Sequence, residues 1–171
     1  SDIITTVSPR YAIEIQYPYQ SYGLHPLLNT RLNDLHGIVN GIDMQQWNPE
    51  TDPMIVSHFN ADNFRDQRPP NKRQLQEESG LAVRDDVMVI GLVSRLVEQK
   101  GLDLAFPALR QFLSAEDVQF VGLGSGEPHF NDMLAQLGAD FYGKAKANVG
   151  FNAALAQHIY AGCDVFLMPS H

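Results

Sequence analysis

The chain has 171 residues, of which 44% are hydrophobic and 19% charged, a balance typical of a globular domain and unlike a disordered segment. Its formal net charge of −8 argues against general affinity for nucleic acid or for an anionic membrane surface. No apolar run approaches the roughly 20 residues that a membrane-spanning helix requires. The single cysteine, Cys163, cannot form an internal disulfide. We therefore expect a cytoplasmic protein, or a plastid one if the source is a plant.

The first part of the chain alternates short apolar runs with turn residues. Residues 2–7 are rich in β-branched side chains and predict a short buried strand, and Ser8-Pro9 then predicts the start of a helix. Residues 37–43 predict a second short strand closed by turn residues. Residues 36–70 contain several prolines and predict a linker.

Beyond residue 70 the pattern alternates between helix and strand. It predicts helices over 71–79, 102–113, 128–137 and 152–161, strands over 87–93, 118–123, 147–151 and 163–168, and a small strand at Phe141 and Tyr142. Repeated βα units imply a parallel sheet with right-handed crossovers and helices on both faces. The fold class predicted is therefore α/β, with a Rossmann-like parallel sheet.

Two cations follow the first strand of this series. Ser94 and Arg95 stand where the strand should end, and Lys100 precedes the next helix. Ligands of open α/β sheets bind beyond the carboxyl ends of the strands, so these cations are placed to face an anion. A guanidinium fork and a mobile ammonium together suit a diphosphate. The alternative is that both cations are solvated or paired with Glu98 and Asp103.

A glycine-rich turn, residues 122–126, follows the second strand of the series. Gly124 and its neighbours could let backbone amides approach a phosphate. The spacing differs from the G-x-G-x-x-G fingerprint, and a dinucleotide-dependent oxidoreductase is a third interpretation that rests on this turn alone. A tight turn between strand and helix explains the glycines equally well.

The remaining candidates have structural explanations of equal or greater weight. The histidines lack metal-ligand spacing, and Cys163 lies in a predicted buried strand, so neither a metal site nor a cysteine nucleophile is expected. Asn40 fits a turn. Phe151 could stack on a base or cover the edge of the sheet. Four tyrosines between residues 11 and 22 could form a stacking face for a sugar or nucleotide, although packing within the loop is the commoner role.

Several segments together resemble the bacterial glycogen synthase and plant starch synthase family of retaining glucosyltransferases. The matching stretches run in the same order over nearly the whole chain. They are Thr6-Val7-Ser8-Pro9, Tyr11-Ala12, Glu14-Ile15, Tyr22-Gly23-Leu24, Gly37-Ile38-Val39-Asn40-Gly41-Ile42-Asp43, Trp47-Asn48-Pro49, Thr51-Asp52-Pro53, Asn71-Lys72, Val93-Ser94-Arg95-Leu96, Gln99-Lys100-Gly101, Gly124-Ser125-Gly126-Glu127, Gly150-Phe151-Asn152, Ile159-Tyr160-Ala161-Gly162 and Phe166-Leu167-Met168-Pro169-Ser170.

The resemblance implies an enzyme with two Rossmann-like domains, the GT-B arrangement, and an active site between them. Such enzymes transfer glucose from ADP-glucose to the non-reducing end of an α-1,4-glucan with retention, and no metal or organic cofactor is implied. By this likeness Arg95 and Lys100 are catalytic: they would bind the donor diphosphate and stabilise charge on the departing ADP. The substrate-binding residues would be Asn40, Ser94, Gly124, Gly150 and Phe151, with Phe151 beside the adenine and Asn40 near the glucosyl and acceptor site.

Two family motifs have no counterpart here. The lysine-containing glycine motif of the N-terminal domain is missing, and so is the glutamate motif that follows the proline-serine, where this chain ends at His171. The expected organisation is a tail of the N-terminal domain over 1–36, an interdomain linker over 37–70, and the first part of a truncated C-terminal nucleotide-binding domain over 71–171. We expect this chain to be inactive alone and to self-associate through exposed apolar surface. The alternative is a non-catalytic module that binds ADP or an ADP-sugar.

Overall fold

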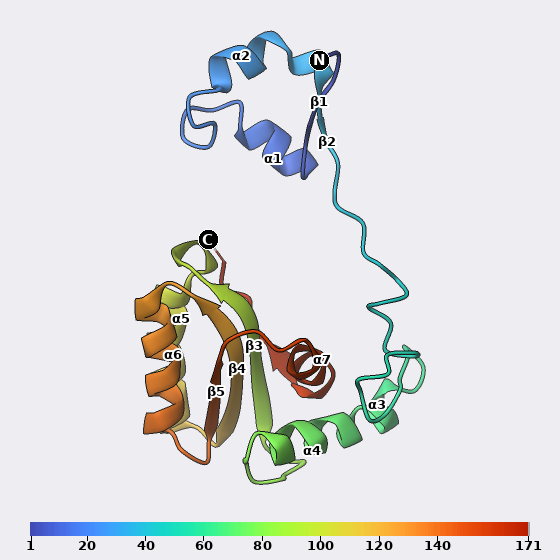
Figure 1. The fold of residues 1–171 in the computed structure, drawn as a ribbon, viewed down its shortest axis with the longest axis vertical. Helices are drawn as coiled ribbons and strands as arrows, with labels where there is room; N and C mark the ends of the chain where they lie inside the picture. Colours follow the sequence, from blue (N-terminus) through green and yellow to red (C-terminus); the bar gives the residue numbers. More distant parts are fainter. Residues whose placement is uncertain (171) are drawn as a thin grey trace. The chain divides into compact units, whose positions relative to one another are not determined.

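The computed structural model describes residues 1–170, and its internal contacts divide the chain between Trp47 and Asn48. The two units, residues 1–47 and the residues from 48 onward, are described separately (Figure 1). No helix within residues 1–170 combines the length and the apolar character needed to cross a membrane.

The first unit is a small α/β element. It contains β1 (Ile4–Thr6), α1 (Pro9–Glu14), α2 (His25–Thr30), the 3-10 turn Leu32–Asp34 and β2 (Leu35–Gly37). The two strands are parallel, with Thr6 opposite Gly37. The predicted start of the first helix is confirmed: the Ser8 hydroxyl accepts a hydrogen bond from the Tyr11 amide at 3.0 Å, and proline follows the cap.

The strand predicted over 37–43 is wrong. β2 ends at Gly37, and the last hydrogen bond of the pair is donated by the Ile38 amide to the Thr6 carbonyl at 2.8 Å. The partner strand stops at Thr6 because Ser8 already caps α1, so nothing remains for the following residues to pair with. Val39 and Ile42 are exposed instead of buried.

The tyrosines of the first unit do not fill the interior of their loop. Tyr19 is 90% exposed and Tyr22 is 95% exposed, so loop packing does not explain either side chain. Tyr22 also has a positive φ of 48°, a conformation that is uncommon for residues other than glycine.

The second unit is an open parallel sheet with helices on both faces. Its elements are α3 (Phe64–Gln67), α4 (Pro69–Glu78), β3 (Met88–Leu96), the 3-10 turn Glu98–Lys100, α5 (Leu102–Ala115), β4 (Val118–Gly126), α6 (Pro128–Asp140), β5 (Ala145–Val149), α7 (Ala153–Gly162) and β6 (Val165–Phe166). The strand order is β5-β4-β3-β6, all parallel. In Figure 1, α5 and α6 lie on one side of the sheet and α4 and α7 on the other. The Rossmann-like α/β prediction is confirmed.

One predicted strand is absent from this unit. Phe141 is the C-cap residue directly after α6, and Tyr142 lies in the following turn with its side chain 94% exposed. The Lys144 amide donates to the Phe141 carbonyl at 2.9 Å, which closes a turn where a strand was expected.

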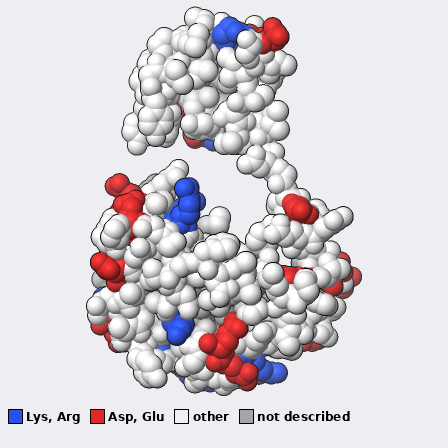
Figure 2. All heavy atoms as spheres, viewed as in Figure 1, with Lys and Arg blue, Asp and Glu red and all other residues white. Residues whose placement is uncertain are grey.

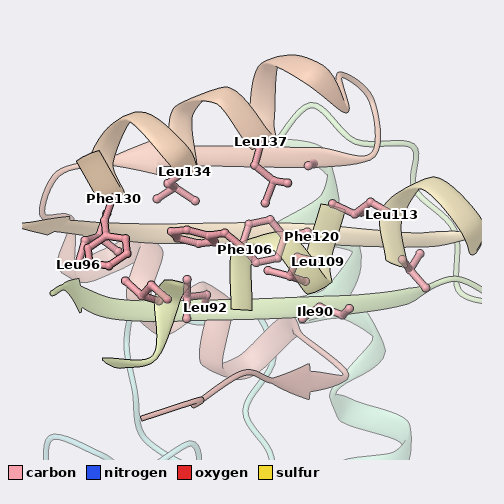
Figure 3. Packing of buried hydrophobic residues seen from close by; sticks show 13 residues of the cluster. Ile90, Leu92, Leu96, Phe106, Leu109, Leu113, Phe120, Phe130, Leu134 and Leu137 are labelled. Carbon is pink, nitrogen blue, oxygen red and sulfur yellow. The ribbon is translucent and has the colours of Figure 1, made fainter. Parts of the chain in front are cut away.

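The strand sequences supply both faces of the core through their period of two. Ile90, Leu92 and Phe120 point to the side covered by α5 and α6, where they meet the helix side chains drawn in Figure 3. Val89 and Val121 point to the other side and join the cluster under α4 and α7. A near-continuous apolar run is what a strand buried on both faces requires.

Residues 48–63 are attached to the second unit, although the sequence predicted them to be part of a linker. The Asn71 side chain accepts from the Ser57 amide at 3.1 Å and donates to the Ser57 carbonyl at 2.8 Å. The His158 ring contacts the Met54 carbonyl and the Glu78 carboxylate, both at 2.8 Å. The assignment of residues 37–70 as an interdomain linker stays a prediction.

Candidate functional site

The carboxyl ends of three neighbouring strands bring the candidate residues of the second unit together. The register pairs Ser94 of β3 with Gly124 of β4, and Gly124 with Val149 of β5. Gly150 therefore directly follows this row, and Arg95 is one residue beyond it on the central strand. The sequence placed these residues at strand ends, and the parallel register aligns them at one edge of the sheet.

Gly124 is required by the close approach of two strands. A Cβ atom at this position would overlap the carbonyl oxygen of Ser94 and lie 2.9 Å from a methyl group of Leu96. On its other side, the Gly124 carbonyl accepts a hydrogen bond from the Gly150 amide at 2.8 Å. Gly150 has a φ of +146°, which a residue with a side chain rarely adopts. The glycines thus let the ends of the three strands lie close together.

Lys100 closes a short 3-10 turn between β3 and α5. The Lys100 amide donates to the Val97 carbonyl at 2.9 Å, and Gly101 then takes a left-handed conformation with a φ of +63°. Gly101 is also in close contact with the Pro169 carbonyl, which a Cβ atom at this position would overlap. The loops that follow β3 and β6 therefore touch beside Lys100.

The side chains of Arg95 and Lys100 are available to a ligand. Arg95 is exposed and Lys100 is half-buried, and neither forms an ion pair within residues 1–170. Within residues 1–170 neither side chain is ion-paired with Glu98, and solvation of both cations stays an open alternative to ligand binding. Lysine and arginine form only small separate patches on the face shown in Figure 2, so positive charge is local on this acidic chain.

Phe151 and Asn152 connect the strand edge to the next helix. The Asn152 side chain caps α7 by accepting from the Leu155 amide at 3.0 Å. Phe151, directly before this cap, is 91% exposed. The side chain therefore does not cover the edge of the sheet, and its ring is free to stack on a planar ligand.

Asn40 is the candidate residue that belongs to the first unit. It is exposed, in a stretch without helix or strand that follows β2.

Cys163 is a core residue, as the sequence predicted. It is 4% exposed in the cluster under α4 and α7, and burial raises the pKa of its thiol to about 11. Within residues 1–170, no group of three or more His, Cys, Asp and Glu side chains is arranged to hold a metal ion.

Glu127 is a residue of this edge to which the sequence analysis gave no role. Its backbone amide donates to the Leu96 carbonyl at 2.8 Å, and its carboxylate accepts from the Glu98 amide at 3.3 Å. The available signal was an acidic residue directly after a glycine-rich turn, a pattern that by itself does not reveal a contact with the neighbouring loop.

A family model, curated relatives and a solved structure all match this chain to glycogen synthases or starch synthases. Residues 1–30 match the family model described as the starch synthase catalytic domain. The glycogen synthase of Streptococcus gordonii is 48% identical over 99% of this chain. The catalytic domain of starch synthase IV from Arabidopsis thaliana, bound to ADP and acarbose, superposes on 99% of this chain with a TM-score of 0.91 at 36% identity. The chain belongs to the glycogen synthase and starch synthase family.

The chain spans only about a third of the length of these relatives. It spans 35% of the S. gordonii glycogen synthase and 35% of the starch synthase IV chain. The Anabaena protein HepE, crystallised with UDP-glucose, shares the fold at a TM-score of 0.61 with 20% identity, and the chain covers 38% of it. The fold neighbours are GT-B glycosyltransferases, and this chain corresponds to about a third of such an enzyme.

Proposed function

We propose that this chain is part of a glucosyltransferase that transfers glucose from ADP-glucose to the non-reducing end of an α-1,4-glucan, with retention of the anomeric configuration. The observation that carries the proposal is the superposition over 99% of the chain on a starch synthase whose structure holds ADP. Because the chain spans about a third of its relatives, we expect it to be inactive alone.

Arg95 and Lys100 are assigned to the donor diphosphate. The leaving ADP gains negative charge in the transition state, and cations already in place lower the barrier more than they strengthen ground-state binding. Support comes from the position of Arg95 at the carboxyl end of β3 and of Lys100 in the turn that follows, and from the absence of ion pairs at either side chain within residues 1–170. Arg95 would supply a planar fork of donors and Lys100 a point charge.

The remaining assignments concern the nucleoside and the sugar. The backbone of Ser94, Gly124 and Gly150 at the strand ends would lie under the donor, and Phe151 would stack beside the adenine. Asn40 would contact the glucosyl group and the acceptor, an assignment that rests on the family likeness alone. No organic cofactor or resident metal is part of the proposal.

A second candidate is a non-catalytic module that binds ADP or an ADP-sugar through the same residues. The exposure of Arg95 and Phe151 favours this candidate, since binding needs fewer groups than glucose transfer. Incubation with radiolabelled ADP-glucose and glycogen separates the two: label in glycogen excludes the module. Label that stays in ADP-glucose, with ADP bound, fits either the module or a partial enzyme.

Calorimetric titration of ADP into the chain tests the nucleotide site. We expect saturable binding that weakens at least about tenfold in Arg95→Ala, since a charge-assisted pair with phosphate contributes roughly 1.5–3 kcal/mol. Arg110→Ala is the matched control, because Arg110 is paired with Asp140 on the helical face. Equal affinity in Arg95→Ala, or no binding by the unaltered chain, would contradict the assignment.

The chain is also expected to self-associate. The edge strand β6 leaves Val165 46% exposed, and Met168 beyond it is 76% exposed. Gel filtration at increasing concentration should show dimers or larger species. A monomer that persists at high concentration would count against this expectation.

A further inference from the structure

Glu127 connects the ends of β3 and β4 through two contacts. Its amide donates to the Leu96 carbonyl at 2.8 Å, and its carboxylate accepts from the Glu98 amide at 3.3 Å. The preceding Gly126 allows this approach, because a Cβ atom there would overlap the Leu96 carbonyl oxygen. Both contacts are made to the few residues that lead from β3 to Lys100.

The Glu98 amide opens the 3-10 turn that carries Lys100. The turn closes on itself through the Lys100 amide to Val97 and the Gly101 amide to Glu98, both at 2.9 Å. The first amide of such a turn has no partner inside it and needs an acceptor from elsewhere. The Glu127 carboxylate supplies that acceptor from the neighbouring strand end.

The negative charge of Glu127 is unfavourable for the diphosphate binding that we propose at this edge of the sheet. A carboxylate near cations that are to bind a diphosphate weakens anion binding by repulsion. The second carboxylate oxygen of Glu127 lies 3.8 Å from a ring nitrogen of His129 on α6. A role in holding the turn explains why a hydrogen-bond acceptor at this place is useful despite its charge.

We propose that Glu127 is a positioning residue that holds the Glu98–Lys100 turn, so that Lys100 is kept in place for the donor diphosphate. It acts through Lys100 and does not itself touch the nucleotide. The proposal rests on the function proposed above for Lys100.

The test compares Glu127→Ala with Glu127→Gln. Both variants remove the same negative charge, but glutamine keeps an oxygen that can accept from the Glu98 amide. Any difference between them therefore reports the hydrogen bond and not the charge. Asp132→Ala removes an exposed carboxylate one turn further along α6 and is the control for general charge effects.

Two measurements are made on the three variants and the unaltered chain. Hydrogen exchange of the Glu98 amide, followed by NMR, should speed up in Glu127→Ala and stay slow in Glu127→Gln. ADP affinity should be about three- to tenfold weaker in Glu127→Ala than in Glu127→Gln, the range expected for one hydrogen bond. Equal Glu98 exchange in the two Glu127 variants, or equal ADP affinity, would overturn the proposal.

The outcome also separates this proposal from the proposed function. If the unaltered chain does not bind ADP, the nucleotide assignment fails for this chain, while Glu98 exchange still decides whether Glu127 holds the turn. If ADP binds and depends on Arg95 but Glu98 exchange does not depend on Glu127, the function stands and the positioning role is wrong.

Discussion

Lys72 on α4 and Asp164 just before β6 form an ion pair of 2.7 Å that ties the two segments together. The Lys72 side chain is 11% exposed and also donates to the Val87 carbonyl at 2.6 Å and the Asp85 carbonyl at 3.1 Å. Asp164 in turn accepts from the Val89 amide at 2.8 Å. One lysine thus connects a helix, the start of the central strand and the start of an edge strand.

Replacement of Lys72 should therefore destabilise the second unit. We expect Lys72→Ala to lower the free energy of unfolding by about 2 kcal/mol, since it leaves carbonyl groups and a carboxylate without their donor. This expected loss of unfolding free energy is smaller than the loss for a fully buried ion pair, because the Asp164 side chain is 39% exposed to solvent. Urea unfolding followed by circular dichroism measures the change. Arg10→Ala, which removes an exposed pair with Glu14, should change stability little.

Gly91 should not tolerate a side chain. A Cβ atom there would lie 2.7 Å from a methyl carbon of Ile159 and 2.9 Å from the sulfur of Cys163, because α7 packs directly on β3. We expect Gly91→Ala to destabilise by about 1–3 kcal/mol through overpacking. Thermal unfolding gives the measurement. Gly41→Ala, at a site with no atom within 4 Å of the added carbon, should leave the melting temperature unchanged.

The thiol of Cys163 should be unreactive in the folded chain. Burial raises its pKa to about 11, against an ordinary value of 9.0, so the thiolate fraction at neutral pH falls about 100-fold even before access is considered. Reaction with a chromogenic disulfide at pH 8 should be slow in buffer and fast in denaturant. Rapid labelling of the folded chain would show that the core under α7 opens readily.

Acidification should destabilise the second unit through its surface carboxylates. The pKa of Asp85 is lowered by the hydrogen-bonded Arg73, and the pKa values of Asp86 and Asp117 are lowered by the hydrogen-bonded Arg84. Because the unfolded chain binds protons at higher pH than the folded one, the stabilisation is present above about pH 4 and is lost as pH falls through the lowered values. Melting temperatures between pH 5 and 2.5 give the test, and Arg84→Gln should flatten the decline. An equally steep decline in Arg84→Gln would exclude these pairs as its cause.

Much of the second unit could be predicted because its signals are local. The apolar run that begins at Val87 and the periodic apolar positions of α5 specify a buried strand and a helix without reference to distant residues. Arg95 and Lys100 could be placed at a strand end for the same reason. The alternation of strands and helices implies that the strands pair in parallel, and parallel pairing places Arg95 and Lys100 at the same edge of the sheet as Gly124 and Gly150.

Other features depended on partners that no local pattern reveals. Residues 37–43 have the composition of a strand, yet no partner strand extends beyond Thr6, so the prediction was wrong. Phe151 had two interpretations until its exposure was known. The contact of Glu127 with the loop before Lys100 could not be predicted, because it joins residues 29 positions apart.

Apolar periodicity, capping residues and collinear motifs are properties of the chain itself, and they were enough to predict the α/β class, most elements of the second unit and the family. Three features required the folded structure: which apolar runs pair with another strand, which side chains stay exposed, and which acceptor the Glu98 amide contacts. These depend on the register and spacing of segments far apart in the chain, where close contacts such as that between Gly124 and Ser94 arise only once the strands have paired.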